Sequence, residues 1–351
     1  MPQSVGDRSS FLSIDDVVTR FNAAGYITDR RLATTIYLVS KLNKPVLLEG
    51  PAGVGKTELA KTLATVTGRR LLRLQCYEGQ DETRALYEWD YGKQLLYTQM
   101  LREKINDIIA DAPDIPAAVE RIEGHDAVFF SDHFLVARPL LDAIRGEAPA
   151  VLLIDEVDRA DEALEAVFLE CLGEYQVSVP EIGTYTAKTP PYVVLTSNNT
   201  RDLSAALKRR CLHLFLDYPD AERELEIVRS KQTGLPEAAA RQLIQVVRGL
   251  RELPLRKSPS ISETIDWART LAVLGVEELD AGVLAETANV VLKYERDMQR
   301  AVEVLPGLAD PNRTLPEPGH SHPHGHGEHG HGTGHLHGDE NGSGPGGSGK
   351  P

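Results

Sequence analysis

The stretch VLLEGPAGVGKTELAKTLA, residues 46–64, joins an apolar run to a glycine-rich loop and then to a helical pattern. The loop matches G-x-x-x-x-G-K-[ST] from Gly50 to Thr57. Its glycines let successive backbone N–H groups turn inward around a phosphate, and the dipole at the helix N-terminus favours negative charge there. The spacing predicts a phosphate-binding loop between a buried strand and a helix. The residues expected to line the nucleotide are Gly50, Pro51, Ala52, Gly53, Val54, Gly55, Lys56, Thr57 and Glu58.

Such a loop works with an acidic residue at the end of a neighbouring strand. VLLIDEVDRA, residues 151–160, places Asp155 and Glu156 directly after an apolar run, where ligands bind in open α/β sheets. We expect Lys56 to reach the phosphate oxygens, while Thr57 and Asp155 hold Mg²⁺. Glu156 is then positioned to polarise the attacking water.

Two further motifs follow in order along the chain. VVLTSNNT, residues 193–200, ends an apolar strand in amides, and one of them can sense the terminal phosphate. We predict Asn198 for this role, with Asn199 as the alternative. AALKRRC, residues 205–211, ends a short helix in two arginines, a type of residue that can reach a neighbouring subunit's site as a finger. Arg210 is preferred over Arg209, although a helix-end cation can also simply face solvent.

The alternation of strands and helices predicts an α/β fold with a mostly parallel sheet, followed by helices alone. Strands are expected at 45–50, 70–76, 150–154, 192–196 and 212–216, a hairpin at 176–188, and helix from Phe134 to Ile144. The second part shows four helical stretches. The predicted domains are a lead-in at 1–20, a nucleotide-binding domain at 21–217, a helical lid at 218–306 and a His/Gly-rich disordered tail at 307–351.

Composition limits the class of protein. The net charge of −14 argues against a nucleic-acid-binding surface. No apolar run of about 20 residues occurs, so we expect a cytoplasmic protein without a membrane span. The three cysteines are widely spaced, which favours buried thiols over a disulfide framework or a zinc site.

Together these motifs resemble an AAA+ ATPase, and more specifically the MoxR family, closest to its CoxD-, NorQ- and CbbQ-like branch. The segments that carry the resemblance are residues 25–64, 75–100, 151–187 and 190–210. By the same resemblance, residues 78–110 correspond to the insert that this family carries in its second helix, and residues 176–188 to the hairpin before sensor 1. The lid departs from the family pattern, because Ser260 stands where such lids often carry a sensor-2 arginine. Arg256, Lys257 or Arg269 could substitute, or sensor 2 is absent.

The resemblance implies a homo-oligomeric ring, a hexamer, that uses ATP to remodel a client protein. It also implies a partner with a von Willebrand factor A domain and a metalloenzyme client that is matured or activated. No guanine-specific NKxD motif follows the strand that ends at Asp155 and Glu156, so ATP is preferred over GTP as the nucleotide.

The tail suggests a second hypothesis. Its histidines can bind Ni²⁺, Cu²⁺ or Zn²⁺, which would suit metal delivery or storage with a subsidiary ATPase; alternatively, the tail is a solvated linker. These histidines are His320, His322, His324, His326, His329, His331, His335 and His337. A nucleic-acid or restriction-type motor on the same AAA+ core is a third possibility, which the acidic balance disfavours.

Overall fold

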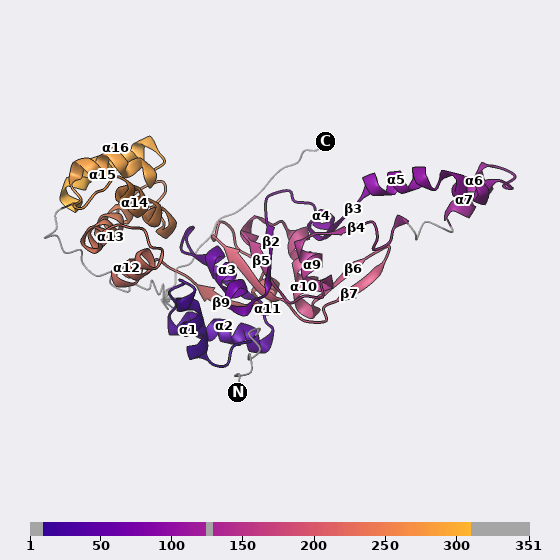
Figure 1. Cartoon of the computed structure of the whole chain (residues 1–351), viewed down its shortest axis with the longest axis horizontal. Helices are drawn as coiled ribbons and strands as arrows, with labels where there is room; N and C mark the ends of the chain where they lie inside the picture. Colours follow the sequence, from indigo (N-terminus) through magenta and orange to yellow (C-terminus); the bar gives the residue numbers. More distant parts are fainter. Residues whose placement is uncertain (1–9, 124–128, 310–351) are drawn as a thin grey trace, which may run out of the picture. The chain divides into compact units, whose positions relative to one another are not determined.

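The computed structural model describes residues 10–123 and 129–309 of the chain and centres on a five-stranded parallel sheet (Figure 1). The order of its strands is β2-β5-β8-β1-β9, and every neighbouring pair is parallel. These strands are β1 (Val46–Glu49), β2 (Arg70–Gln75), β5 (Ala150–Asp155), β8 (Tyr192–Ser197) and β9 (Leu212–Phe215). The predicted α/β AAA+ fold class with its parallel sheet is confirmed.

The sheet is covered on both faces because its central strands are apolar throughout. All residues of β1, β5 and β8 are buried, and successive side chains point to opposite faces. One face packs on α1 (Ile14–Ala23), α2 (Arg30–Leu42) and α3 (Lys56–Thr67). The other packs on α4 (Glu82–Leu86), α9 (Pro139–Arg145), α10 (Glu162–Glu174) and α11 (Ala205–Arg210). The carboxyl ends of all five strands therefore meet at one edge, between two helical layers.

Between β2 and β5 in the sequence, the described residues include a small antiparallel pair of strands with three helices between its two strands. Strand β3 (Tyr87–Trp89) pairs with β4 (Leu135–Ala137). The helices between these strands are α5 (Tyr91–Met100), α6 (Arg102–Ile109) and α7 (Ile115–Glu123). The helix expected from Phe134 to Ile144 is confirmed from Pro139, where α9 begins, but is wrong for residues 134–138, because residues 135–137 pair with a strand far away in sequence. Local periodicity carries no information about such a partner.

The hairpin at 176–188 consists of β6 (Gln176–Val179) and β7 (Gly183–Thr186), which pair antiparallel. Val177 and Val179 point into the same hydrophobic cluster as α10, so the hairpin is anchored by one face. A 3-10 turn, η1 (Val157–Arg159), follows β5.

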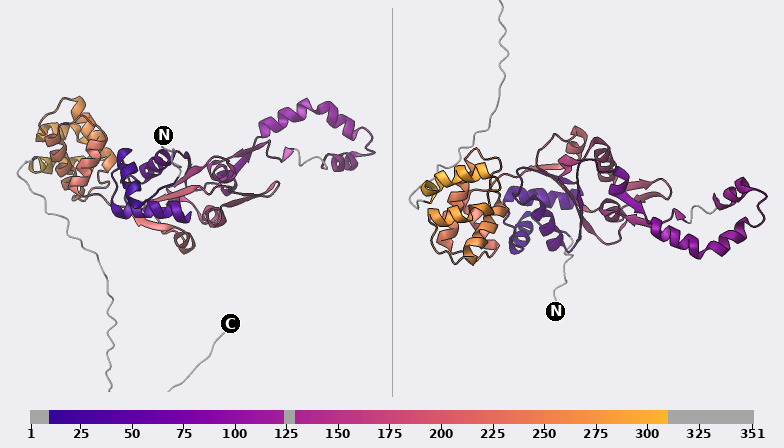
Figure 2. Two further views of the ribbon diagram at one scale, coloured as in Figure 1. Left: turned by 60° about the horizontal axis from the view of Figure 1, so that its bottom comes forward. Right: turned by 90° about the horizontal axis from the view of Figure 1, so that it is seen from above.

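Residues 221–308 are helical and have a hydrophobic cluster of their own, which includes Leu243, Trp267 and Leu305. In both views of Figure 2 these helices, orange to yellow, form one bundle. They are α12 (Ala221–Ser230), α13 (Glu237–Arg251), α14 (Ile261–Val273), α15 (Ala281–Thr287), the 3-10 turn η2 (Ala288–Val290) and α16 (Glu295–Leu308). This part of the described chain thus holds five α-helices where the sequence predicted four. Residues 1–313 form one compact unit, and the division into domains at residue 217 stays a prediction.

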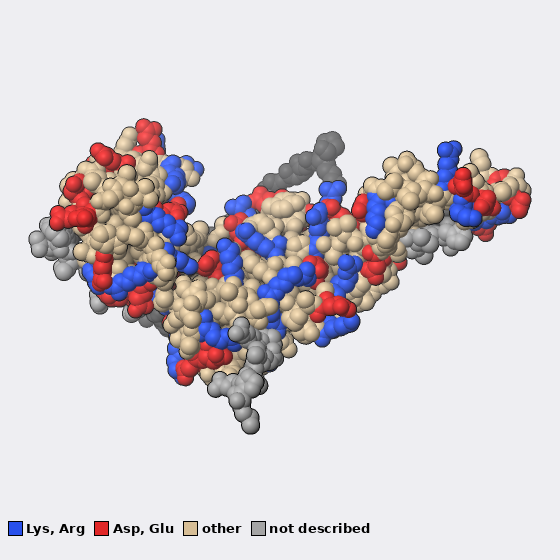
Figure 3. Space-filling model, in the orientation of Figure 1, with Lys and Arg blue, Asp and Glu red and all other residues tan. Residues whose placement is uncertain are grey.

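On the face shown in Figure 3, Lys and Arg side chains are interspersed with Asp and Glu. Within residues 10–123 and 129–309, no helix is both long and apolar enough to span a bilayer. The predicted tail at 307–351 lies, from residue 310 onward, outside the described residues.

Candidate functional site

The phosphate loop runs from Gly50 to Gly55 and connects β1 to α3. Gly50, Gly53 and Gly55 have φ values of 147°, 74° and 97°, in the region that favours glycine. A Cβ on Gly50 would lie 1.9 Å from the carbonyl oxygen of Leu216, so no larger residue fits there. The sequence motif is thus required by the backbone itself. Pro51, Ala52 and Val54 lie in the turns between these glycines, and Glu58 lies in the first turn of α3.

Lys56 lies at the centre of this loop and is buried. Its ammonium group donates to the carbonyl oxygens of Gly50 (2.6 Å) and Pro51 (2.7 Å) and to Oδ1 of Asn198 (2.9 Å). Desolvation lowers the pKa of Lys56, while the nearby carboxylates of Asp158, Asp155 and Glu156 oppose that shift. These three acceptors hold the ammonium group of Lys56 against the loop.

The structure separates the two candidate asparagines. Asn198 contacts Lys56, whereas Asn199 adopts a left-handed conformation at φ 57° and donates its backbone N–H to Oγ of Ser197 (3.0 Å). Asn199 therefore shapes the turn after β8, and Asn198 is the amide that faces the loop. The sensing role of Asn198 stays a prediction.

Asp155 ends β5 beside Thr57, and almost none of its surface is exposed. Its Oδ1 lies 3.2 Å from the Thr57 hydroxyl and also accepts from the Thr196 hydroxyl. Its Oδ2 accepts from Nη2 of Arg73 at 2.6 Å.

The hydroxyl and carboxylate oxygens of Thr57 and Asp155 suit Mg²⁺, which binds oxygen at about 2.1 Å in an octahedral shell whose neighbouring ligands are roughly 3 Å apart. Within the described parts of the chain, no group of three or more His, Cys, Asp or Glu side chains could hold a metal. A cation at Asp155 would therefore depend on Thr57, water and phosphate oxygens.

Glu156 follows Asp155 in a strained conformation. Its φ of 55° and ψ of 49° lie in the left-handed region, which is uncommon for a side chain of this kind. Its backbone N–H donates to the Thr196 hydroxyl (3.0 Å), and its carboxylate pairs with Nε of Arg159 at 2.9 Å. The side chain of Glu156 therefore leaves the backbone in a different direction from that of an extended strand residue.

Asp158 connects the two polar loops and was missed by the sequence analysis. Its Oδ2 accepts from the backbone N–H groups of Asn198 (3.2 Å) and Thr200 (3.0 Å) and from the Thr200 hydroxyl (2.6 Å). Burial would raise the pKa of this carboxyl, but these hydrogen bonds outweigh burial and hold the pKa below its usual range. Its place three residues after Asp155 was the only available signal, and the partner loop lies 40 residues further on.

Arg209 and Arg210 lie elsewhere. They end α11, and Leu212 begins β9 directly after them, so they sit at the amino end of a parallel strand. The phosphate loop and Asp155 follow carboxyl ends of strands in the same sheet. Both arginines are exposed, and neither forms an ion pair with any described residue. Within one chain, the predicted finger is therefore at the wrong edge of the sheet to reach the nucleotide.

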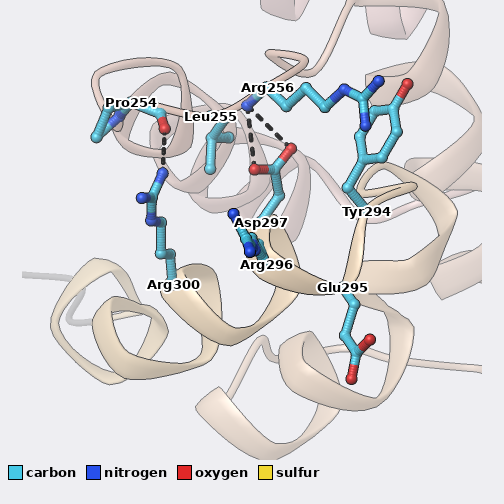
Figure 4. Close-up of a pocket in the computed structure, with 8 residues that line it drawn as sticks. All are labelled: Pro254, Leu255, Arg256, Tyr294, Glu295, Arg296, Asp297 and Arg300. Atoms are coloured by element: carbon cyan, nitrogen blue, oxygen red, sulfur yellow. Dashed lines mark hydrogen bonds between the residues drawn. The ribbon is translucent and has the colours of Figure 1, made fainter.

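The lid candidates for sensor 2 are also engaged away from the loop. Figure 4 shows the Arg256 guanidinium over the ring of Tyr294, in a pocket between residues 254–256 and the start of α16. The guanidinium carbon lies 4.2 Å from the centroid of that ring. Lys257 pairs with Glu263 (2.7 Å), and Arg269 pairs with Asp266 (3.7 Å).

Ser260 is the lid residue that meets the phosphate loop. A Cβ built on Gly53 would lie 2.3 Å from the Cβ of Ser260. Ser260 is also the N-cap of α14, where its hydroxyl and the Glu263 side chain form a capping box. A short neutral side chain thus occupies the position at which the family resemblance leads one to expect a sensor-2 arginine.

Of the remaining candidates, the described histidines contact other side chains, and the cysteines are buried or half-buried. His213 contacts the carboxylate of Glu49, and His133 contacts the Tyr97 hydroxyl at 3.1 Å. Cys76 and Cys171 are buried, whereas Cys211 is half-buried. His125 and the eight histidines of the tail lie outside the described residues.

A glycine loop on a helix N-terminus, a buried lysine and a strand-end Asp-Glu pair define a P-loop nucleotide hydrolase of the AAA+ type. Residues 45–211 match the AAA domain of the dynein-related subfamily. The chain carries an AAA domain at these residues and is an ATPase.

Over most of its length, the chain is also similar in sequence to bacterial proteins and in fold to a solved structure. An uncharacterized protein of Staphylococcus epidermidis (strain ATCC 12228) is 24% identical over 268 residues, which cover 75% of this chain and 84% of that protein. One from Staphylococcus aureus (strain NCTC 8325) is 24% identical over 269 residues, covering 74% and 88%. The Thermotoga maritima RuvB Holliday junction branch migration motor superimposes with a TM-score of 0.40 at 17% identity, over 81% of this chain and 72% of that one.

Proposed function

We propose that this ATPase is of the MoxR type and works as a ring, a hexamer, that remodels a protein client in the cytoplasm. One observation carries the oligomeric part of the proposal. Arg209 and Arg210 lie at the amino end of β9, while Lys56 and Asp155 lie at the carboxyl edge of the same sheet. If either arginine acts as a finger on the developing phosphate charge, it must therefore act on the nucleotide of a neighbouring chain.

Within one chain, the residues have separate tasks in hydrolysis. The phosphate loop and Lys56 hold the phosphates, and Thr57 and Asp155 are the residues that would hold Mg²⁺. The ion would neutralise charge on the phosphate oxygens. Glu156 takes the position of the group that orients and polarises the attacking water, and Asn198 aligns the terminal phosphate. In this proposal, residues 21–217 form the nucleotide-binding domain and 218–306 the lid.

The client side of the proposal rests on the sequence resemblance and on two elements that the fold does not need for hydrolysis. Helices α5 and α6 have no buried residue, and the hairpin β6–β7 is anchored by only one of its faces. Such elements are suited to contact other proteins. In the MoxR resemblance those proteins are a von Willebrand A-domain partner and a metalloenzyme client.

The proposal is tested with Glu156→Gln as a trap. This variant should bind ATP with unchanged affinity, lose turnover by at least about a hundredfold, and form a ring in ATP that retains the client in a pull-down. The matched control is the Lys56→Ala/Glu156→Gln double variant, which keeps every surface but cannot hold the phosphates. A Glu156→Gln chain that stays monomeric in ATP, as measured by light scattering, would contradict the ring.

The tail has a separate part in the proposal. Its histidines would bind Ni²⁺, Cu²⁺ or Zn²⁺ as neutral imidazoles. Calorimetric titration of the full chain against a chain that ends at residue 309 measures this directly. Client activation that survives the truncation at limiting metal would limit the tail to metal binding without a role in delivery.

A further inference from the structure

Arg73 is a charged residue on β2, an edge strand of the sheet. It lies in β2, two residues before Gln75, so both side chains point to the same face. Gln75 is paired in register with Asp155 on the neighbouring strand β5. This places the guanidinium of Arg73 at the carboxyl edge of the sheet, where it donates to Oδ2 of Asp155 at 2.6 Å and to Oε1 of Gln75 at 2.6 Å.

The atom that Arg73 contacts belongs to the predicted metal ligand. The other oxygen of Asp155 receives the hydroxyls of Thr57 and Thr196. A buried carboxylate whose charge has no counterpart is costly, and Glu156 and Asp158 add negative charge close by. The Arg73 guanidinium supplies that counter-charge. It contacts Oδ2, an oxygen whose negative charge a divalent cation would otherwise neutralise.

The geometry of the pair allows it to open. A single guanidinium nitrogen, Nη2, makes both contacts, so the strong two-nitrogen fork of an arginine–carboxylate pair is not formed. The Arg73 side chain is 51% exposed, whereas the Asp155 side chain is 6% exposed. The carboxylate is therefore fixed in the protein, while the guanidinium can swing into water at low cost.

We propose that Arg73 is a positioning residue that holds Asp155 in the metal-free site and leaves it when the site takes Mg²⁺. The inference rests on the proposed Mg²⁺ role of Thr57 and Asp155. A guanidinium and a divalent cation repel each other at such a separation, so they compete for the same carboxylate. Arg73 thereby weakens the coupling between the metal and the nucleotide, and keeps the loop after β5 in its binding conformation between turnovers.

The experiment measures the affinity of a fluorescent ADP in Mg²⁺ and in EDTA, and takes the ratio of the two affinities as the metal coupling. ADP avoids turnover. In Arg73→Met, EDTA leaves Asp155 uncompensated next to the phosphates, whereas Mg²⁺ compensates it without competition. The coupling should rise about tenfold, the size expected for a hydrogen bond to a charged group. Arg73→Lys, which keeps the cation, should return most of the wild-type value.

Arg70→Met is the matched control. Arg70 lies on the same strand, is 46% exposed and pairs with Asp142 at 3.0 Å, away from Asp155. It should leave the coupling unchanged. Asp155→Asn should lower the coupling, and the Arg73→Met/Asp155→Asn double variant should equal Asp155→Asn alone.

The outcomes distinguish a failure of the role of Arg73 from a failure of the proposed Mg²⁺ site. An Arg73→Met coupling equal to or below that of the wild type overturns the role of Arg73. A coupling that Asp155→Asn leaves unchanged overturns the proposed Mg²⁺ site, and the inference with it. If Arg73→Met does not fold by circular dichroism, Arg73→Gln takes its place, with a smaller rise expected and the same reversal.

Discussion

The Nζ of Lys56 lies 2.9 Å from Oδ1 of Asn198, although 142 residues separate them in the chain. The contact joins the loop after β1 to the loop after β8, two strands that are neighbours in the sheet. Because the same ammonium group also bonds to two loop carbonyls, Asn198 is held beside the phosphate loop through Lys56.

Asn198→Ala should lower ATP turnover by about a hundredfold, because one aligned polar group at the reacting phosphate is lost. ATP affinity should change little. The control is Asn199→Ala, whose side chain is not needed at the phosphate but whose left-handed backbone should cost about 1 kcal/mol of stability. Steady-state hydrolysis and thermal melts distinguish the two variants. A larger loss of turnover in Asn199→Ala would reverse the assignment.

Arg210→Ala should lower turnover by about a thousandfold or more and spare ATP binding, as expected for a finger that stabilises the transition state. Because the finger acts on a neighbour, mixing Arg210→Ala chains with Lys56→Ala chains should restore part of the activity. The mixed interfaces in which the Arg210→Ala chain supplies the loop and the Lys56→Ala chain supplies the arginine are then intact.

Arg209→Ala is the control for that experiment, since Arg209 is the adjacent and equally exposed arginine. It should lose far less activity. Mixed rings that remain inactive would show that Arg210 does not work across an interface.

Asp158→Asn should destabilise the protein by about 1 kcal/mol at pH 7, because charge-assisted hydrogen bonds to the turn at Asn198–Thr200 become neutral ones. The pKa of Asp158 is lowered by folding, so its contribution is present above the unfolded value of about 3.9 and is lost as pH falls through the lower folded value. The difference between wild type and variant in urea unfolding should therefore shrink below about pH 4. A difference that stays constant with pH would contradict the ionised role of Asp158.

Arg251→Met should destabilise the helical part by about 3–5 kcal/mol, because it leaves the fully buried carboxylate of Glu224 without its partner. The two side chains pair at 2.7 Å and are 10% and 0% exposed. Arg241→Met is the matched control, since its pair with Glu222 is 46% and 74% exposed and should contribute at most about 1 kcal/mol. Equal effects of the two substitutions on denaturant unfolding would show that burial does not decide the value of the pair.

Much of the fold was predictable because its signals are local. Apolar runs too short for helices predicted the five strands, and the helix from Lys56 to Thr67 begins and ends where the glycines stand. The pairing of β3 with β4 was not predictable, because Tyr87 and Ala137 are joined only through space. The same holds for the contacts of Arg73 and Asp158, because both residues touch partners far along the chain.

The amino-acid sequence alone determined the phosphate loop and the Asp-Glu pair at the end of β5, because each is a motif of consecutive residues that can be recognised without knowledge of the packing. The tertiary structure decided which side chains meet there. It brought Asn198 rather than Asn199 to Lys56, put Arg73 on Asp155 and Ser260 beside Gly53, and placed Arg210 at the opposite edge of the sheet. Strand order, register and side-chain direction decide such contacts, and they depend on the packing of the whole chain.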